Sequence, residues 1–275
     1  MRGPRVLVFD SGLGGLTVLA RIAEARPDAA IVYVADDAAF PYGALGEREV
    51  VARVMSVMES LIPRYAPDLV VIACSTASTL VLEPLRQRYR ALPFVGTVPA
   101  IKPAAAASKS RLVSVLATPG TVARDYTQAL VREYAGDCEV ALVGSARLAS
   151  LAEEFMKGVA VDEAEIAREI APCFIERRGR RTDLVVLACT HYPLLREHFA
   201  RLAPWPVDYV DPAPAIARRV DALLGPAGAP PPTGVRASAI FTSGREPGAA
   251  LQGALLKFGL VATPSDAGAF QFGRP

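Results

Sequence analysis

Two segments of this 275-residue chain repeat one another. Residues 68–76 read Asp-Leu-Val-Val-Ile-Ala-Cys-Ser-Thr, and residues 183–191 read Asp-Leu-Val-Val-Leu-Ala-Cys-Thr-His. Each segment is a short apolar run, typical of a buried strand, that ends in Ala-Cys and precedes a helical pattern. The repeat predicts two related α/β halves. Each half then carries one thiol, Cys74 or Cys189, at the carboxyl end of a strand, where open parallel sheets place their ligand sites.

The same alternation continues along the chain. Short β-branched runs are separated by amphipathic segments, which is the pattern of parallel sheets covered by helices. The expected strands are 5–9, 31–35, 69–73, 94–97, 112–116, 139–143, 184–188, 207–210 and 236–242. The expected helices are 14–25, 47–64, 123–134, 163–177, 194–202 and 249–258. The Pro/Gly/Ala-rich segment 225–234 is expected to be a surface loop or linker.

The length and the repeat together favour two lobes of α/β class with a functional cleft between them. We expect a discontinuous first lobe made of residues 1–98 and 208–260. Residues 99–207 are expected to form the second lobe, and residues 261–275 an irregular tail.

Charge and composition exclude several classes of protein. The chain has 30 Lys+Arg against 28 Asp+Glu and 52% hydrophobic residues, so it can bury a large core. A near-neutral chain is unlike a dedicated nucleic-acid binder, which carries a clustered basic excess. The densest basic cluster, residues 177–181, is expected to be a solvated loop at the end of the helix over 163–177.

The ends and the cysteines indicate a cytoplasmic protein. No apolar run approaches the ~18 residues of a membrane span, and the apolar run 6–9 is too short for a signal peptide. The four cysteines are therefore expected to stay reduced. Because the chain has no CxxC pair and only two histidines, we expect no metal site.

A thiol at the start of a helix has a chemical advantage. The positive end of the helix dipole favours thiolate over thiol, and a modest fall from the usual pKa of about 8.5 makes cysteine a usable base. Two such thiols facing one carbon, Cys74 and Cys189, can remove a proton from one face and deliver one to the other. The alternative is that each cysteine packs as a small hydrophobe. Cys138 and Cys173 lack this context and are interpreted as structural.

Two ionisable residues lie close to these thiols in the sequence. His191, at the elbow between strand and helix, is expected to stabilise the Cys189 thiolate or to protonate the substrate; its alternative role is a helix cap. Asp10 is expected to orient a substrate ammonium or to tune Cys74; its alternative role is also a helix cap. The glycine-rich segment 10–15 fails the GxGxxG pattern and is expected to hold a carboxylate with its N–H groups.

Further candidates come from the other turns. Tyr42, in the turn 40–43, offers an N–H or hydroxyl to a ligand unless the segment is a plain turn. Ser75, Thr76 and Ser78 begin the helix after Cys74 and offer hydroxyl and backbone donors, with helix capping as the alternative.

Taken together, these residues resemble the glutamate racemases of the aspartate/glutamate racemase superfamily. The resemblance runs through residues 8–211 and rests on segments 10–16, 41–43, 72–74, 96–103, 117–121 and 188–195. It implies a cytoplasmic, cofactor-independent isomerase that makes D-glutamate for peptidoglycan. It also implies two pseudo-symmetric flavodoxin-like domains with the active site in the cleft between them. Glutamate is the implied partner, with neither nucleic acid nor membrane required, and a homodimer is an expected assembly.

The resemblance also assigns roles to residues. Cys74 and Cys189 become the two proton donor/acceptors, with Cys189 acting on the L-isomer and Cys74 on the D-isomer. Asp10 supports Cys74 and His191 supports Cys189, while the family's supporting glutamate corresponds by a loose alignment to Glu153. The implied substrate contacts are Asp10, Ser11, Tyr42, Gly43, Ser75, Thr76, Thr190 and His191.

One position departs from the family pattern. The family usually has Asn directly after the first cysteine, where this chain has Ser75. A serine hydroxyl is shorter than a carboxamide and offers fewer hydrogen bonds, so we expect weaker glutamate binding than with Asn. The departure leaves other substrates open, such as aspartate or another small carboxylate. A further alternative is a binding module that closes its two lobes on a carboxylate without catalysis.

Overall fold

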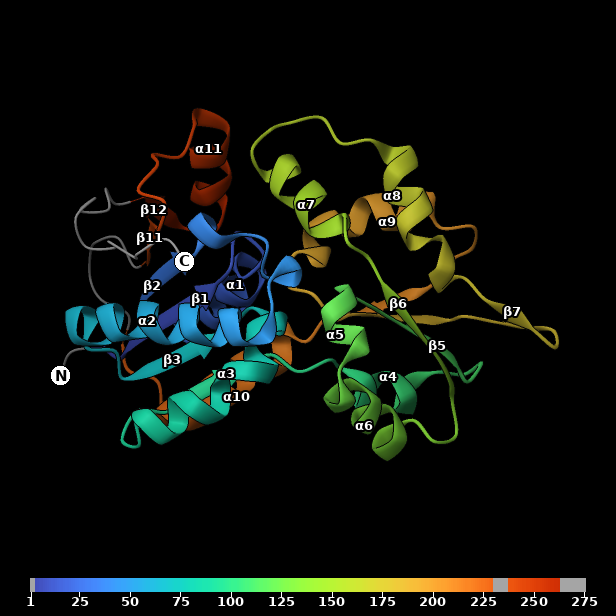
Figure 1. The fold of residues 1–275 in the computed structure, drawn as a ribbon, viewed down its shortest axis with the longest axis horizontal. Coiled ribbons are helices and arrows are strands. Elements are labelled where there is room, and N and C mark those ends of the chain that lie inside the picture. The colour runs from blue at the N-terminus through green and yellow to red at the C-terminus, as the bar shows by residue number, and fades with distance from the viewer. Residues whose placement is uncertain (1–2, 230–236, 263–275) are drawn as a thin grey trace.

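The computed structural model describes residues 3–229 and 237–262, which form two parallel sheets side by side (Figure 1). In the first sheet the strand order is β12-β11-β2-β1-β3-β4, and every neighbouring pair is parallel. Its strands are β1 (Arg5–Asp10), β2 (Ala30–Ala35), β3 (Leu69–Ile72), β4 (Phe94–Gly96), β11 (Ala237–Phe241) and β12 (Leu260–Ala262). The first sheet thus joins strands from both ends of the described chain.

The second sheet has four parallel strands in the order β10-β9-β5-β6. These strands are β5 (Leu112–Ala117), β6 (Glu139–Gly144), β9 (Leu184–Leu187) and β10 (Asp208–Val210). A two-stranded antiparallel hairpin of β7 (Glu176–Arg177) and β8 (Arg180–Arg181) projects away from the first sheet (Figure 1). The expected α/β class with two parallel sheets is confirmed.

Helices cover both faces of each sheet because the central strands are apolar on both sides. On the first sheet, α1 (Leu16–Ala25), α10 (Ala213–Leu224) and α11 (Ala249–Lys257) pack on one face, and α2 (Glu47–Tyr65) and α3 (Ser75–Arg88) on the other. On the second sheet, α7 (Leu148–Met156), α8 (Glu163–Ile170) and α9 (Arg196–Leu202) cover one face. The opposite face carries α4 (Ile101–Ala107), α5 (Pro119–Ala123) and α6 (Asp125–Tyr134).

The strand order creates a crevice in each sheet. The chain leaves β1 for β2 on one side and returns to β3 on the other; in the same way β6 and β9 lie on opposite sides of β5. Ligands of open parallel sheets bind at the carboxyl ends of strands at such a switch point. Cys74 follows β3 and Cys189 follows β9, so each repeated segment delivers its thiol to the switch point of its own sheet.

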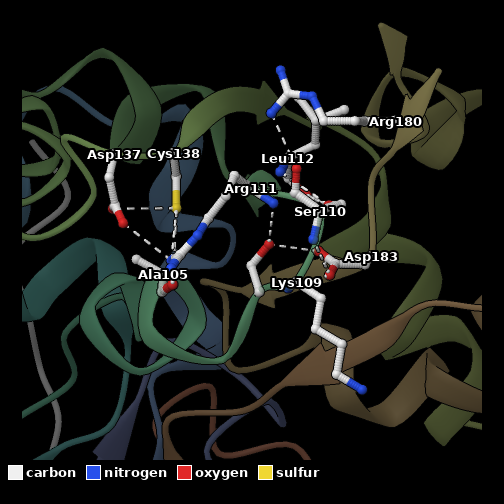
Figure 2. Close-up of polar contacts among 10 residues, drawn as sticks. Ala105, Lys109, Ser110, Arg111, Leu112, Asp137, Cys138, Arg180 and Asp183 are labelled. Carbon is white, nitrogen blue, oxygen red and sulfur yellow. Dashed lines mark hydrogen bonds and ion pairs between the residues drawn. The ribbon is translucent and has the colours of Figure 1, made fainter. Parts of the chain in front are cut away.

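The first residue of each repeat also has a matching structural role. Asp68 accepts a hydrogen bond of 2.7 Å from the backbone N–H of Arg5, where β1 begins. Asp183 accepts bonds of 2.7 and 2.9 Å from the N–H groups of Lys109 and Ser110, just before β5 (Figure 2). Each aspartate therefore fixes the start of the neighbouring strand in its own sheet, which explains why the repeat begins at this residue.

The expected strands are all present, with ends that shift by no more than two residues; β12 was not expected. The helix expected over 163–177 is wrong in its second half. α8 ends at Ile170, because Pro172 lacks the N–H that a continuing helix needs, and the arginine cluster lies in the β7–β8 hairpin instead of a loop. The helix expected over 123–134 is two helices that meet at Arg124, whose backbone is extended.

The expected boundaries need one correction and leave one prediction. β10 pairs with β9 of the second sheet, although a boundary at residue 208 assigns it to the first lobe. The division into lobes stays a prediction, with the return to the first lobe now placed after Val210. Residues 261 and 262 belong to β12 and not to an irregular tail; the rest of that tail, and residues 230–234 of the expected linker, lie outside the described residues. Within the described ranges, no helix combines the length and apolarity needed to span a membrane.

Candidate active site

Both repeated cysteines open into one cavity of about 140 Å³ between the two sheets. Its walls come from the loops that follow the strands of each sheet. They comprise Ser11, Phe40, Pro41, Tyr42, Gly43, Ala44, Cys74, Ser75, Thr76, Thr118, Pro119, Ser145, Ala146, Ala149, Cys189, Thr190 and His191. Pockets for drug-sized ligands usually exceed about 300 Å³, so this cavity suits a much smaller molecule. A small ligand held here contacts groups from both repeats at once.

Cys74 lies at the N-terminal end of α3 and is almost completely buried. Its Sγ is 3.5 Å from the Ser11 hydroxyl, which comes from the loop after β1. Burial, with the nearby charge of Asp10, raises the pKa of the Cys74 thiol to about 12, although Ser11 and the Ala77 N–H oppose the shift. The raised pKa therefore favours the thiol form of Cys74 at neutral pH.

Cys189 has a different neighbour, a buried histidine. His191 Nδ1 lies 3.9 Å from Cys189 Sγ, and the other ring nitrogen, Nε2, lies 3.0 Å from Glu153 Oε1. Burial alone would lower the pKa of His191, but hydrogen bonds to Cys189 and Glu153 and the charges of Cys189 and Asp10 raise it well above its usual value. The raised pKa favours the cationic form of His191; although this residue precedes the 3-10 helix Tyr192–Leu195, its side chain makes no capping hydrogen bond there and contacts Cys189 and Glu153 instead.

Glu153 links this histidine to the first lobe's glycine-rich loop. It projects from α7, and its Oε1 also accepts a hydrogen bond of 2.5 Å from the Leu13 N–H. Burial would raise the pKa of Glu153, but His191 and then Lys157 outweigh that effect and lower the pKa to about 2. A backbone N–H of this loop thus binds a carboxylate of the protein itself, and the expectation that the loop holds a ligand carboxylate stays a prediction.

Asp10 occupies the corresponding place behind Cys74. Its Oδ1 accepts a 2.9 Å hydrogen bond from the Gly12 N–H, and its Oδ2 accepts one of 3.0 Å from the Thr190 hydroxyl. Asp10 is not the cap of α1, which begins at Leu16 after Gly15. Burial raises the pKa of Asp10, while the charge of His191 opposes the rise.

Two glycines allow the loop after β1 to meet the second sheet. A Cβ on Gly12 would lie 2.3 Å from Glu153 Oε1, and a Cβ on Gly14 would lie 2.5 Å from His191 Nδ1. At Gly14 a Cβ would also lie 2.6 Å from the His191 backbone nitrogen, so glycine is required there, whereas at Gly12 a Cβ would displace the Glu153 carboxylate. The glycine pattern that resembles a phosphate loop therefore reflects packing between the two halves.

Three predicted substrate contacts differ in whether their side-chain hydroxyl is already hydrogen-bonded within the protein. Tyr42 and Gly43 both line the cavity, and the Tyr42 hydroxyl is already bonded to buried Asp36. The Ser75 hydroxyl is buried, and no hydrogen-bond partner is found for it within the described residues. The Thr76 hydroxyl lies 3.3 Å from that of Thr118 in the second lobe. The Ser75 hydroxyl can therefore still form hydrogen bonds with a ligand.

Most of the predicted site is brought together. Ser11, Tyr42, Gly43, Cys74, Ser75, Thr76, Cys189, Thr190 and His191 line the cavity, whereas Asp10 and Glu153 lie behind it. Ser78 does not reach the cavity; its hydroxyl bonds to the Ile72 carbonyl. Sequence reasoning missed Thr118 and Ser145 as wall residues. Both follow a strand of the second sheet, and position at a strand's carboxyl end was the signal that could have found them.

The family described as Asp/Glu/Hydantoin racemase matches residues 10–220. The chain belongs to this family. The matched range begins at the carboxylate behind Cys74 and runs past Cys189 into α10, so it includes every wall of the cavity. The chain is accordingly a member of a family of isomerases, and the expected membership is confirmed.

Individual racemases of known name are similar over most of their length. The glutamate racemase of Brucella anthropi is 59% identical over 221 residues, which cover 80% of each chain. That of Mesorhizobium japonicum is 55% identical over 240 residues, covering 87% of this chain and 92% of its own. Escherichia coli glutamate racemase, crystallised with L-glutamate and the activator UDP-MurNAc-Ala, superposes with a TM-score of 0.85 at 38% identity. That match covers 94% of this chain and 97% of the other.

Proposed function

We propose that this protein interconverts L- and D-glutamate by proton transfer between two cysteines, without a cofactor. The observation that carries the proposal is that Cys74 and Cys189 line one small cavity from opposite repeats. The names of relatives at 55 and 59% identity support glutamate as the substrate. We also propose that the reaction takes place in the cytoplasm and supplies D-glutamate for peptidoglycan, as the family resemblance implies.

In the proposed reaction from L to D, the Cys189 thiolate removes the α-proton and the Cys74 thiol delivers its proton to the opposite face. The reverse reaction exchanges these roles. Two features support this direction: His191 places a cation at Cys189, and burial with Asp10 keeps Cys74 protonated. The α-carbon of an amino acid is weakly acidic, so the cavity must also exclude water and stabilise the carbanion.

The cavity walls supply what that carbanion and its carboxylates need. The free N–H groups at the start of α3 point toward the Cys74 end, where a helix N-terminus favours negative charge. Hydroxyls of Ser11, Ser75 and Thr76 are proposed to bind the substrate from the first lobe, with Tyr42 and Gly43 through their backbone. Thr190 and His191 are proposed to bind it from the second lobe, and Asp10 to support Cys74.

The proposal is tested by incubating the protein with L-glutamate in D₂O. We expect D-glutamate to appear with deuterium at the α-carbon, and Cys74→Ser to abolish both racemisation and this deuterium incorporation. A Cys74→Ser variant that racemises at the full rate with no pyridoxal bound would refute the two-thiol scheme. Glutamate binding without deuterium incorporation by the unaltered protein would support a carboxylate-binding module instead, and faster turnover of aspartate in the same assay would reassign the substrate.

A further inference from the structure

Lys157 contacts the buried carboxylate behind His191. It follows the last residue of α7, and its Nζ lies 2.9 Å from Glu153 Oε2. The two side chains differ in their surroundings: that of Glu153 is 6% exposed, whereas that of Lys157 is 49% exposed. The lysine therefore brings a cation from the surface to a carboxylate that has little contact with solvent.

The two oxygens of Glu153 have separate tasks. Oε1 is shared by His191 Nε2, at 3.0 Å, and the Leu13 N–H, at 2.5 Å, while Oε2 is paired with Lys157. Rotation of the carboxylate would break both contacts of Oε1. A buried carboxylate without its full set of partners also carries a desolvation penalty and tends to rearrange.

We propose that Lys157 is a positioning residue for the Cys189 half of the reaction, a role that rests on the proposed function. By holding Oε2, Lys157 keeps Oε1 on His191, and His191 in turn faces Cys189 Sγ at 3.9 Å. The contacts form a continuous series from the surface to the sulfur. On the Cys74 side, Asp10 is bonded to Gly12 and Thr190 and is paired with no lysine or arginine among the described contacts, and the cation of that side, Arg124, binds the Thr76 carbonyl instead.

An ordinary pair on a helix surface would behave differently. Lys157 and Glu153 are four residues apart, a spacing at which ion pairs stabilise a helix without any further effect. Arg21 and Glu24 form an ordinary surface pair on α1 at the related spacing of three residues, with a 2.8 Å contact and both side chains more than half exposed. Arg21→Gln is therefore the matched control for the loss of a surface ion pair.

The experiment compares Lys157→Gln, Lys157→Arg and Arg21→Gln by α-deuterium isotope effects measured from each enantiomer. Because the two enantiomers have equal free energy, kcat/KM must be the same in both directions, and only the isotope effects can report which cysteine has been impaired. With Lys157→Gln we expect kcat to fall roughly three- to tenfold, the loss typical of one partly buried charge contact. Lys157→Arg should restore most of that loss.

The isotope effects give the decisive pattern. If the Cys189 step becomes slower, the isotope effect should rise for α-deuterated L-glutamate, whose deuterium Cys189 removes. It should fall toward one for the D-enantiomer, whose deuterium leaves by the Cys74 step. Arg21→Gln should change neither value.

A second comparison tests whether Lys157 acts through Glu153. In a Glu153→Gln background, Lys157→Gln should have no further effect on kcat or on either isotope effect. Equal changes for the two enantiomers, a full additional loss in that background, or no difference from Arg21→Gln would each overturn the inference. If the unaltered protein racemises glutamate while Lys157→Gln behaves like the control, only the role of Lys157 fails. Absence of racemisation in the unaltered protein would contradict the proposed function itself.

Discussion

The two cysteines of this protein occupy equivalent places in two related sheets but have opposite electrostatic neighbours. Cys74 lies near the carboxylate of Asp10, and its thiol has a pKa raised to about 12. Cys189 lies 3.9 Å from the imidazole of His191, whose pKa is itself raised well above the usual value. One side thus favours a thiol and the other places a cation beside the sulfur.

This difference shows how a duplicated unit can serve a reaction that needs an acid and a base at the same moment. The strand and the cysteine are alike in both halves, and both sulfur atoms line a common cavity. The helical segments that follow differ, because α3 begins directly after Cys74 whereas a short 3-10 helix begins at Tyr192. Two residues near the sulfurs come from outside the repeated segments: Asp10 is the last residue of β1, whereas Glu153, which binds His191, projects from α7. The repeat sets the position of each sulfur, whereas the charged groups near the two sulfurs differ.

The largest expected effect comes from removing either sulfur. Cys74→Ala and Cys189→Ala should each lower racemisation by roughly 10²- to 10⁴-fold, the usual contribution of a positioned acid or base. Polarimetry or chiral chromatography measures the loss. Cys173→Ala, which alters a buried cysteine outside the cavity, is the control and should leave the rate within about a factor of two of the unaltered protein. A racemisation rate that neither Cys74→Ala nor Cys189→Ala lowers would contradict a role for these sulfurs in the reaction.

Replacing the histidine should impair one side alone. His191→Gln removes the cation beside Cys189, and we expect kcat to fall on the order of 10²-fold. The α-deuterium isotope effect should increase for L-glutamate and decrease for D-glutamate, because only the Cys189 step is slowed. Isotope effects that increase for both enantiomers would mean that His191 serves the two cysteines alike.

The residues directly after the cysteines give a third contrast. The Thr190 hydroxyl is bonded to Asp10, whereas the Ser75 hydroxyl has no partner within the described residues. Ser75→Asn should lower KM for glutamate roughly ten- to a hundredfold, since a carboxamide can add a hydrogen bond to a charged substrate group. Equal kinetics of the two forms would contradict this expectation.

Thermal unfolding measures the same contrast between Thr190 and Ser75 as a difference in stability. Thr190→Val should destabilise the protein by roughly 1–3 kcal/mol, because a buried oxygen of Asp10 loses its donor. Ser75→Ala should leave stability nearly unchanged, since no protein hydrogen bond is lost.

The last comparison separates the two carboxylates, Glu153 and Asp10, by the pH dependence of the protein's stability. The pKa of Glu153 falls from 4.5 to about 2 on folding, so its contribution of ~3 kcal/mol is present above pH 4.5 and is lost as the pH falls toward 2. The stability gap between Glu153→Gln and the unaltered protein should therefore close over that range in denaturant titrations.

Asp10 should behave in the opposite way. Its pKa is raised on folding, so the stability linked to its protonation is present at pH below 3.8 and is lost as the pH rises through the folded value. Asp10→Asn should consequently become less destabilising as the pH increases. Parallel pH profiles for the two variants would show that these carboxylates do not differ as described.

Much of this protein could be predicted from the order of its residues. Apolar runs bounded by turn residues located the nine expected strands, and the position of Cys74 and Cys189 directly after such runs placed both at the carboxyl edge of a sheet. These predictions succeed because strand burial and strand-to-helix turns are local properties, set by a few neighbouring side chains. The end of α8 was missed because Pro172 was not weighed against the helical pattern around it.

The tertiary structure alone decided how distant residues meet. Nothing near Leu13 in the sequence shows that its N–H binds Glu153, or that Gly14 must lack a side chain because His191 lies against it. Nor does the sequence show that Asp36 binds the Tyr42 hydroxyl, while the Ser75 hydroxyl finds no hydrogen-bond partner in the part of the chain that the structure describes. Such pairings depend on the docking of one sheet against the other. The sequence determines where each thiol lies on its own sheet, and only long-range packing sets the charges that surround it.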